Sequence, residues 1–408
     1  MFKKIRNKLS LLGPSLLWAS AAIGVSHIVQ STRAGATYGY ALIIAVILAN
    51  ILKYPFFEFA TRYTVVKNET VLDGYKKIGK WAIYLYIGLT ISTMFTIQAG
   101  VTLVTAAILE NWLDLGIFFS SLVVLSICMI VIYFIKGNFF VRFIKFLILI
   151  LIISTVASAL LTTNVEIEIS KEFQEPEILS YIGISFVIAL IGWMPSPIDL
   201  SAWSSIWIME RRERNSNFSI KDNSFDFNFS YIVTTILAVI FLILGANVFY
   251  GSGTEFASSG SSFVNQLAEL YSSLGPGAKN LILLSAFSAM FSTTITCLDA
   301  FPKVLTKCSE LVFIRGSKNL FLFIVAAGTL LTIFYFSNEM RRLIDIATIL
   351  SFLTSPFLAY LNYRLIYKTD FPKDSRPHHF IKLLSLLGMF FLITFSIIFI
   401  INRLGLIY

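Results

Sequence analysis

Charged residues are scarce in this sequence. Of its 408 residues, 13% are Asp, Glu, Lys or Arg, and 57% are hydrophobic. A soluble globule of this size needs more polar surface than that, so the scarcity indicates an integral membrane protein. The formal net charge of +9 does not indicate nucleic-acid binding, because no basic face interleaved with aromatic residues is present.

Cysteine and histidine are also rare, with three residues of each. Cys128, Cys297 and Cys308 show no C-x-x-C spacing, which excludes a disulfide framework and a zinc site of the usual kind. The chain also lacks an H-E-x-x-H motif, paired intramembrane aspartates and a Ser/His dyad at recognisable spacing. We therefore expect neither an enzyme nor a cofactor.

Long apolar runs fill most of the chain. Windows of about 20 apolar residues, the length that crosses a bilayer, predict eleven transmembrane helices. No intervening segment is long enough for a soluble domain, so residues 1–408 are interpreted as a single all-α transmembrane domain. The predicted spans are 13–38, 40–61, 81–109, 115–135, 140–162, 180–209, 229–250, 278–301, 319–337, 343–367 and 380–402.

The positive charges predict how these spans are oriented. With the N-terminus inside, most of the 32 lysines and arginines fall in cytoplasmic segments, as the positive-inside rule requires. An odd number of spans then places the C-terminus outside. We expect a multi-pass protein of a plasma membrane, such as a bacterial inner membrane. The basic residues left outside are Arg33, Lys171, Lys279, Arg341, Arg342 and Arg403.

The sixth span carries the most unusual stretch, Ile191-Gly-Trp-Met-Pro-Ser-Pro-Ile-Asp-Leu-Ser201. Pro195 and Pro197 each remove a backbone donor and clash with the preceding turn, so a continuous helix is not expected through them. Asp199 adds a carboxylate at the same depth, and an acid inside a membrane segment is a functional hypothesis. The structural alternative is that the prolines only kink the helix for packing and that Asp199 forms a hydrogen bond with a neighbouring helix.

The first span carries a second interruption. Residues 19–28 form a run of small and polar side chains, and Gly24 beside Ser26 weakens the helix there. Interrupted helices at corresponding places in two halves are typical of transporters built from inverted repeats, with the substrate held between the breaks. The predicted repeats are about 13–162 and 180–367, and the eleventh span, about 380–402, is an addition.

The sequence then resembles a known family. The residues that carry the resemblance are Gly13-Pro-Ser-Leu-Leu, Ala34-Gly-Ala-Thr-Tyr-Gly-Tyr40, Leu48-Ala-Asn50, Ile191-Gly192, Pro197, Leu200, Ser204-Ser205, Ser292-Thr-Thr-Ile-Thr-Cys-Leu298 and Pro356-Phe357. The resemblance is specific in the first span and looser elsewhere, through span ten. It implies the LeuT-type fold and divalent-metal transport, as in the NRAMP (natural resistance-associated macrophage protein) transporters.

The site motifs of that family are altered here. Gly24-Val25-Ser26-His27 stands where the family has Asp-Pro-Gly-Asn, and Ser196-Pro197-Ile198 stands where it has Met-Pro-His. The comparison therefore implies that the soft thioether, which favours transition metals, is absent. The family's acidic residues of span three correspond to the neutral region around Gln98, and its second histidine of span six to Trp203. Proton coupling by the family's usual route is not expected.

Remaining polar groups predict a remodelled site. His27 and Asp199, facing each other across the two breaks, would bind a divalent metal ion together with Ser26, Ser196 and backbone carbonyls near Gly24. Alternatively, His27 and Asp199 form a buried salt bridge without metal. A third interpretation is that half-helix N-termini bind an anion or a carboxylate.

Three polar residues away from the breaks complete the candidates. Thr354, before Pro356 in span ten, is a candidate cavity residue. Lys53 and Glu58 of span two are interpreted as structural, with Lys53 extending to the interface or pairing with Glu58.

The sequence as a whole predicts a secondary transporter, and we expect it to be monomeric. It would move a divalent metal cation through the bilayer by alternating access. The alternatives are the same fold carrying a small organic or anionic solute such as an amino acid, and a non-transporting member of the family.

Overall fold

The computed structural model describes residues 12–162, 173–215, 218–252, 262, 264–266, 277–313 and 316–403. These residues form helices and connecting segments, with no strand among them. The helices are α2 (Pro14–Ala22), η1 (Ser26–Ser31), α3 (Thr32–Tyr38), α4 (Ile43–Lys67), α5 (Val71–Ile78), α6 (Lys80–Leu113), α7 (Ile117–Phe134), α8 (Asn138–Leu161), α9 (Tyr181–Trp193), α10 (Leu200–Arg214), α11 (Ile220–Phe249), α13 (Ala278–Leu311), α14 (Lys318–Phe336), α15 (Met340–Tyr367), η2 (Lys373–Ser375) and α16 (His379–Arg403).

The eleven predicted spans are confirmed. Within the described residues, nine helices are long and apolar enough to cross a membrane. The other two predicted spans are the interrupted ones, which are divided into α2, η1 and α3 and into α9 and α10. The short helix α5 was not predicted, because its eight residues are too few for an apolar window. Its start is fixed by a capping box in which Thr70 and Asp73 exchange hydrogen bonds.

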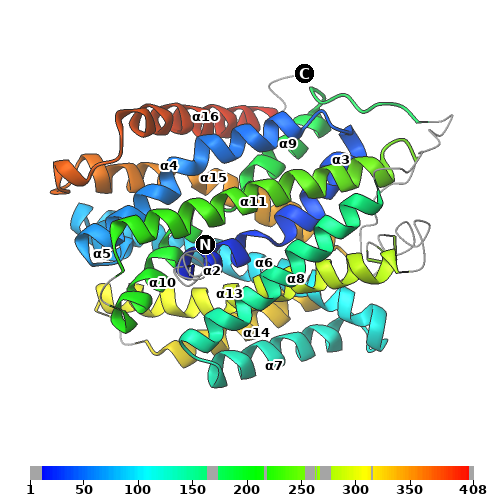
Figure 1. The fold of residues 1–408 in the computed structure, drawn as a ribbon, viewed down its shortest axis with the longest axis horizontal. Coiled ribbons are helices and arrows are strands. Elements are labelled where there is room, and N and C mark those ends of the chain that lie inside the picture. Colours follow the sequence, from blue (N-terminus) through cyan, green and yellow to red (C-terminus); the bar gives the residue numbers. More distant parts are fainter. Residues whose placement is uncertain are drawn as a thin grey trace, which may run out of the picture.

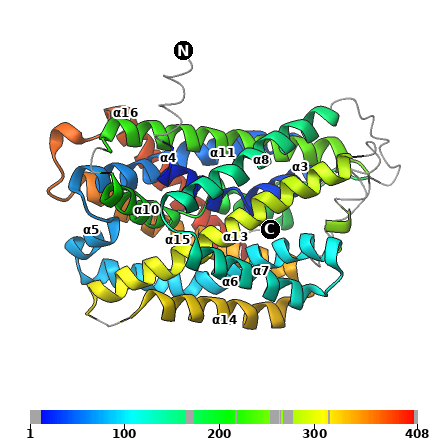
Figure 2. The same cartoon turned by 60° about the horizontal axis from the view of Figure 1, so that its bottom comes forward.

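The two halves of the chain are interleaved. Helix α3 packs against α11, α8 against α13, and α6 against both α13 and α15. In Figures 1 and 2, α7 and α14 lie on one side of the bundle and α4 and α16 lie on the other. Figure 1 also shows α5 and the segment after α15 at the left end, whereas α16 ends at the right. We call the left end the inner end, following the predicted orientation.

The first half of span one is held firmly at its start. Asp226 of α11 accepts hydrogen bonds from the backbone N–H groups of Gly13 and Ser15, both at 2.9 Å. Pro14 between them has no N–H to satisfy, so this carboxylate receives the free donors at the start of α2. The Trp18 ring stacks on Tyr231 of α11 with their ring centroids 5.4 Å apart. Helix α2 is thereby fixed to α11.

The outer half of span one approaches α11 very closely. A Cβ atom built on Gly35 would lie 1.9 Å from the Leu242 carbonyl oxygen, and one built on Gly245 would lie 2.1 Å from the Thr32 carbonyl oxygen. Small residues at such crossings let two helix backbones touch, which is how membrane helices gain packing energy. The two glycines therefore set the position of α3.

Candidate functional site

Span six is broken at the predicted residues. Helix α9 ends at Trp193, α10 begins at Leu200, and the segment between them is not helical. Gly192 lies against α15, since a Cβ atom there would be 2.8 Å from the Thr348 carbonyl oxygen. Ser196 is fully buried, and its hydroxyl donates only a long hydrogen bond, 3.3 Å, to the Pro197 carbonyl. The break thus lies deep in the protein, away from lipid.

Lys53 of α4 reaches this break. Its Nζ donates hydrogen bonds to the carbonyl oxygens of Ile191 and Gly192, both at 2.7 Å, and lies 3.5 Å from that of Ser196. The side chain is completely buried. The interpretation that Lys53 extends to the interface or pairs with Glu58 is therefore wrong, and Glu58 instead pairs with Arg62 at 2.5 Å.

Asp199 stands at the N-terminus of α10 and is buried. Its Oδ1 atom has no hydrogen-bond partner in the structure, which is unusual for a buried carboxylate oxygen. The N-terminus of α10, the positive end of its dipole, favours a negative charge at this position. Asp199 therefore offers a buried carboxyl oxygen that accepts no hydrogen bond from the described residues.

A thioether is also present at the break. Met194 is fully buried, and its Sδ accepts a hydrogen bond of 4.0 Å from the Ser31 hydroxyl of η1. The sequence comparison implied that a soft thioether is absent from the break. That absence holds only for position 196, because the thioether of Met194 lies two residues before it. This contact links the two broken spans directly.

Span one opens after Ala22 and resumes as a π-helix at Ser26. Thr293 of α13 places its hydroxyl in the opened turn, 2.8 Å from the Ser20 carbonyl oxygen and 3.0 Å from that of Ile23. A Cβ atom at position 24 would lie 2.6 Å from the same hydroxyl oxygen, so Gly24 makes room for it. The Ala289 carbonyl oxygen of α13 also lies 3.0 Å from this hydroxyl, and because the hydroxyl has a single hydrogen, it donates to one of these carbonyls at a time.

We expect the Thr293 hydroxyl to stabilise the break measurably. Thr293→Val keeps the shape but leaves a buried carbonyl of the break without its donor, which costs about 1–3 kcal/mol. Thermal unfolding of the detergent-purified variant should therefore begin at a lower temperature than that of wild type. Thr293→Ser, which keeps the hydroxyl, is the control, and an unchanged unfolding temperature for the valine variant would contradict this role.

His27 faces α11. Its Nε2 lies 3.0 Å from the Thr234 carbonyl oxygen, and because a carbonyl only accepts, this nitrogen carries the hydrogen. Its Nδ1 lies 2.7 Å from the Ser26 hydroxyl, which is also 2.7 Å from the Ala22 carbonyl oxygen. Both ring nitrogens therefore have protein partners, and His27 would have to release one of them to bind a metal.

The predicted site residues are only partly brought together. Ser196 and Asp199 share the break in span six, and Gly24, Ser26 and His27 share that in span one. No His27–Asp199 ion pair and no group of three metal-ligating His, Cys, Asp or Glu side chains is found in the described part of the chain. Thr354 is half-buried, and its hydroxyl bonds the Ser351 carbonyl of its own helix, away from the α15 face that contacts Gly192.

Span three is neutral where it passes the centre. The Gln98 amide donates to the Thr102 hydroxyl at 3.3 Å and to the Thr294 carbonyl at 3.2 Å. Trp203 of α10 packs edge-on against Phe301 with ring centroids 4.7 Å apart. Neither residue carries an acidic or basic group, in keeping with the expectation from the sequence.

Ion pairs close both ends of the bundle around these breaks. At the outer end, Arg33 of α3 pairs with Asp345 of α15 at 3.1 Å. At the inner end, Lys303 of α13 pairs with Glu210 of α10 at 2.7 Å. These two pairs join α3 to α15 and α10 to α13 at opposite ends of the bundle.

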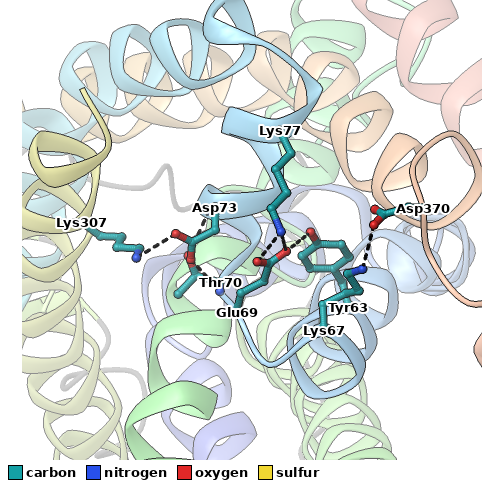
Figure 3. Close-up of polar contacts among 8 residues, drawn as sticks. All are labelled: Tyr63, Lys67, Glu69, Thr70, Asp73, Lys77, Lys307 and Asp370. Atoms are coloured by element: carbon teal, nitrogen blue, oxygen red, sulfur yellow. Dashed lines mark hydrogen bonds and ion pairs between the residues drawn. The ribbon is translucent and has the colours of Figure 1, made fainter. Parts of the chain in front are cut away.

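A second inner contact joins α5 to α13, where Lys307 pairs with Asp73 at 2.8 Å. Figure 3 shows this pair beside the Glu69 carboxylate, which binds Lys77 at 2.6 Å and the Tyr63 hydroxyl at 2.5 Å. Asp73 therefore both caps α5 and anchors it to α13.

Comparison with known proteins identifies the family of this chain. Residues 15–402 match the profile of the natural resistance-associated macrophage protein-like family, NRAMP. The chain belongs to the NRAMP family. It is 35% identical over 412 residues to an uncharacterized protein of Pasteurella multocida (strain Pm70), which covers 98% of this chain and 94% of that relative. It is also 23% identical over 374 residues to the divalent metal cation transporter MntH of Brucella suis biovar 1 (strain 1330), covering 87% of this chain and 79% of that relative.

A solved structure shares the fold. The manganese transporter of Eremococcus coleocola, in complex with an aromatic bis-isothiourea substituted compound, matches with a TM-score of 0.76 at 13% identity. The match covers 96% of this chain and 86% of that one. The NRAMP member described here is therefore a multi-pass membrane protein with the LeuT-type fold, and its family and fold are those of transporters rather than enzymes.

Proposed function

We propose that this NRAMP member is a secondary transporter that moves a divalent metal cation by alternating access. The observation that carries the proposal is the buried Asp199 Oδ1 atom, which has no partner and lies at the break of span six. A buried anionic oxygen without a partner is costly, and a cation that binds it recovers that cost. The names of the two transporters compared above, a divalent metal cation transporter and a manganese transporter, agree with this substrate class.

The proposed ligands come from both breaks. Asp199 supplies the charge, Ser196 a hydroxyl and Met194 a thioether. The oxygen donors suit manganese, magnesium and calcium alike, whereas the soft thioether is a poorer ligand for the harder ions magnesium and calcium than for manganese. His27 joins this shell if its ring leaves the Thr234 carbonyl, and Gly24 and Ser26 line the side of span one.

Alternating access would use the ion pairs at the two ends. Outward opening requires Arg33 to separate from Asp345, and inward opening requires Lys303 to separate from Glu210. Each of these pairs joins helices from different parts of the bundle, so breaking one set frees one side of the centre. The cytoplasmic location of the inner end and a monomeric state belong to this proposal.

Uptake into proteoliposomes tests the proposal. The purified protein should accumulate manganese above the level of protein-free liposomes, with magnesium and calcium compared as competing cations. An inward-negative potential should raise the rate, because a cation is carried. If manganese, magnesium and calcium all enter no faster than into protein-free liposomes, the metal assignment is wrong.

Lys53 favours a second candidate, a small organic or anionic solute. Its ammonium already places one positive charge beside the break, which weakens binding of a further cation and favours a carboxylate at the α10 N-terminus. A thermal-shift screen with metal salts and with amino acids separates the candidates. Stabilisation by an amino acid without any response to divalent metals would select the organic solute.

A further inference from the structure

The carbonyls that bind Lys53 lose their usual helical donors at the break. In a continuous helix the Ile191 carbonyl would receive the N–H of residue 195, but Pro195 has none. This oxygen instead accepts from the Met194 N–H at 3.2 Å and from Lys53 at 2.7 Å. The Gly192 carbonyl would receive the N–H of Ser196, which lies beyond the end of α9. Both oxygens therefore project from the negative end of the α9 dipole.

Such an end is a cation site by its geometry. Unwound carbonyls at the C-terminus of a half-helix are the groups that bind a bare monovalent cation in broken-helix transporters. Here the Lys53 ammonium lies 2.7 Å from two of these oxygens and 3.5 Å from the Ser196 oxygen, with its side chain wholly buried.

We infer that Lys53 is a tethered cation that replaces a free monovalent ion at the break of span six. Because the ammonium comes from the unbroken helix α4, it also holds α9 against α4 without any ion from solution. The inference goes beyond the proposed function, since it holds whichever solute is carried. It predicts that removing the charge converts the break into a site that needs a dissolved cation.

Thermal unfolding of the full-length protein in detergent measures this directly. Lys53→Met should unfold about 5 °C or more below wild type in N-methylglucamine chloride, whose cation is too large to enter. Sodium, potassium or ammonium chloride at equal ionic strength should restore most of the loss, with one small cation more effective than the others. Wild type should show the same midpoint in all four salts.

Two further variants separate charge from hydrogen bonding and from general salt effects. Lys53→Gln keeps an N–H donor without the charge, so it should need a small cation as Lys53→Met does. Lys67→Met removes a lysine from the same helix whose partner, Asp370, is largely exposed (Figure 3), and it should show no preference among the salts.

Several results would overturn the inference. One is an unfolding midpoint of Lys53→Met or Lys53→Gln equal to that of wild type in N-methylglucamine chloride. Another is a lowered midpoint that no small cation raises again. A third is a salt-dependent rise of the midpoint that Lys67→Met shows as well. If the methionine variant does not fold, the glutamine variant and wild type still decide, because a wild-type midpoint that rises specifically with sodium or potassium also contradicts a resident ammonium. Failure of metal uptake would leave these outcomes unchanged.

Discussion

A Gly35→Ala variant is expected to lose about 3 kcal/mol or more of stability, because the added methyl group has no space. Its Cβ atom would lie 1.9 Å from the Leu242 carbonyl oxygen and 2.6 Å from the Ala246 nitrogen. Both are backbone atoms, which cannot move aside as a flexible side chain would. To relieve this overlap, α3 and α11 would have to separate, and their separation would loosen the contacts along the whole crossing.

Gly88 provides the matched control. It lies within the helix α6, and a Cβ atom there would meet nothing within 4 Å. Alanine is the better helix former by about 1 kcal/mol, so Gly88→Ala should unfold at or above the wild-type temperature. Thermal unfolding of both variants in the same detergent checks the prediction, and equal midpoints for Gly35→Ala and Gly88→Ala would show that the close crossing is not required.

The fold could be predicted from the sequence because its signals are local. Apolar runs, clustered positive charges and the residues Pro195, Pro197 and Gly24 each act on their own helix, so they indicate spans, orientation and breaks without knowledge of the neighbours. The structure confirms the spans and the breaks. The boundaries of the two repeats and the direction in which the protein sits in the membrane stay predictions.

The site could be predicted only in part, because its contacts join residues far apart in the sequence. Lys53 is 138 residues from Ile191, and Thr293 is 270 residues from Ile23. No spacing rule links such pairs. The one sequence signal for the Lys53 contact was its position inside a membrane span, where a lysine is rare enough to be treated as functional by default. His27 and Asp199 were expected to face each other, whereas the His27 ring hydrogen-bonds to α11.

Asp199→Asn should lower the initial rate of manganese uptake about 10- to 100-fold. Two unit charges 4 Å apart attract by about 4 kcal/mol at an effective dielectric constant of 20. Desolvation of the ion and the carboxylate offsets part of that attraction, and a remaining 1.4 kcal/mol corresponds to about tenfold. Asparagine keeps the size of the side chain and is an equally good residue at a helix N-terminus, so the variant should still fold.

Asp114→Asn is the matched control for this loss. Asp114 ends α6 with a positive φ of 49°, a conformation that asparagine also adopts readily, and it is exposed. Its uptake should equal that of wild type in the same proteoliposomes. Retained manganese uptake in Asp199→Asn would show that the unpartnered carboxylate oxygen is not a ligand. Manganese would then be carried through other groups at the break, such as the Ser196 hydroxyl and the Met194 thioether.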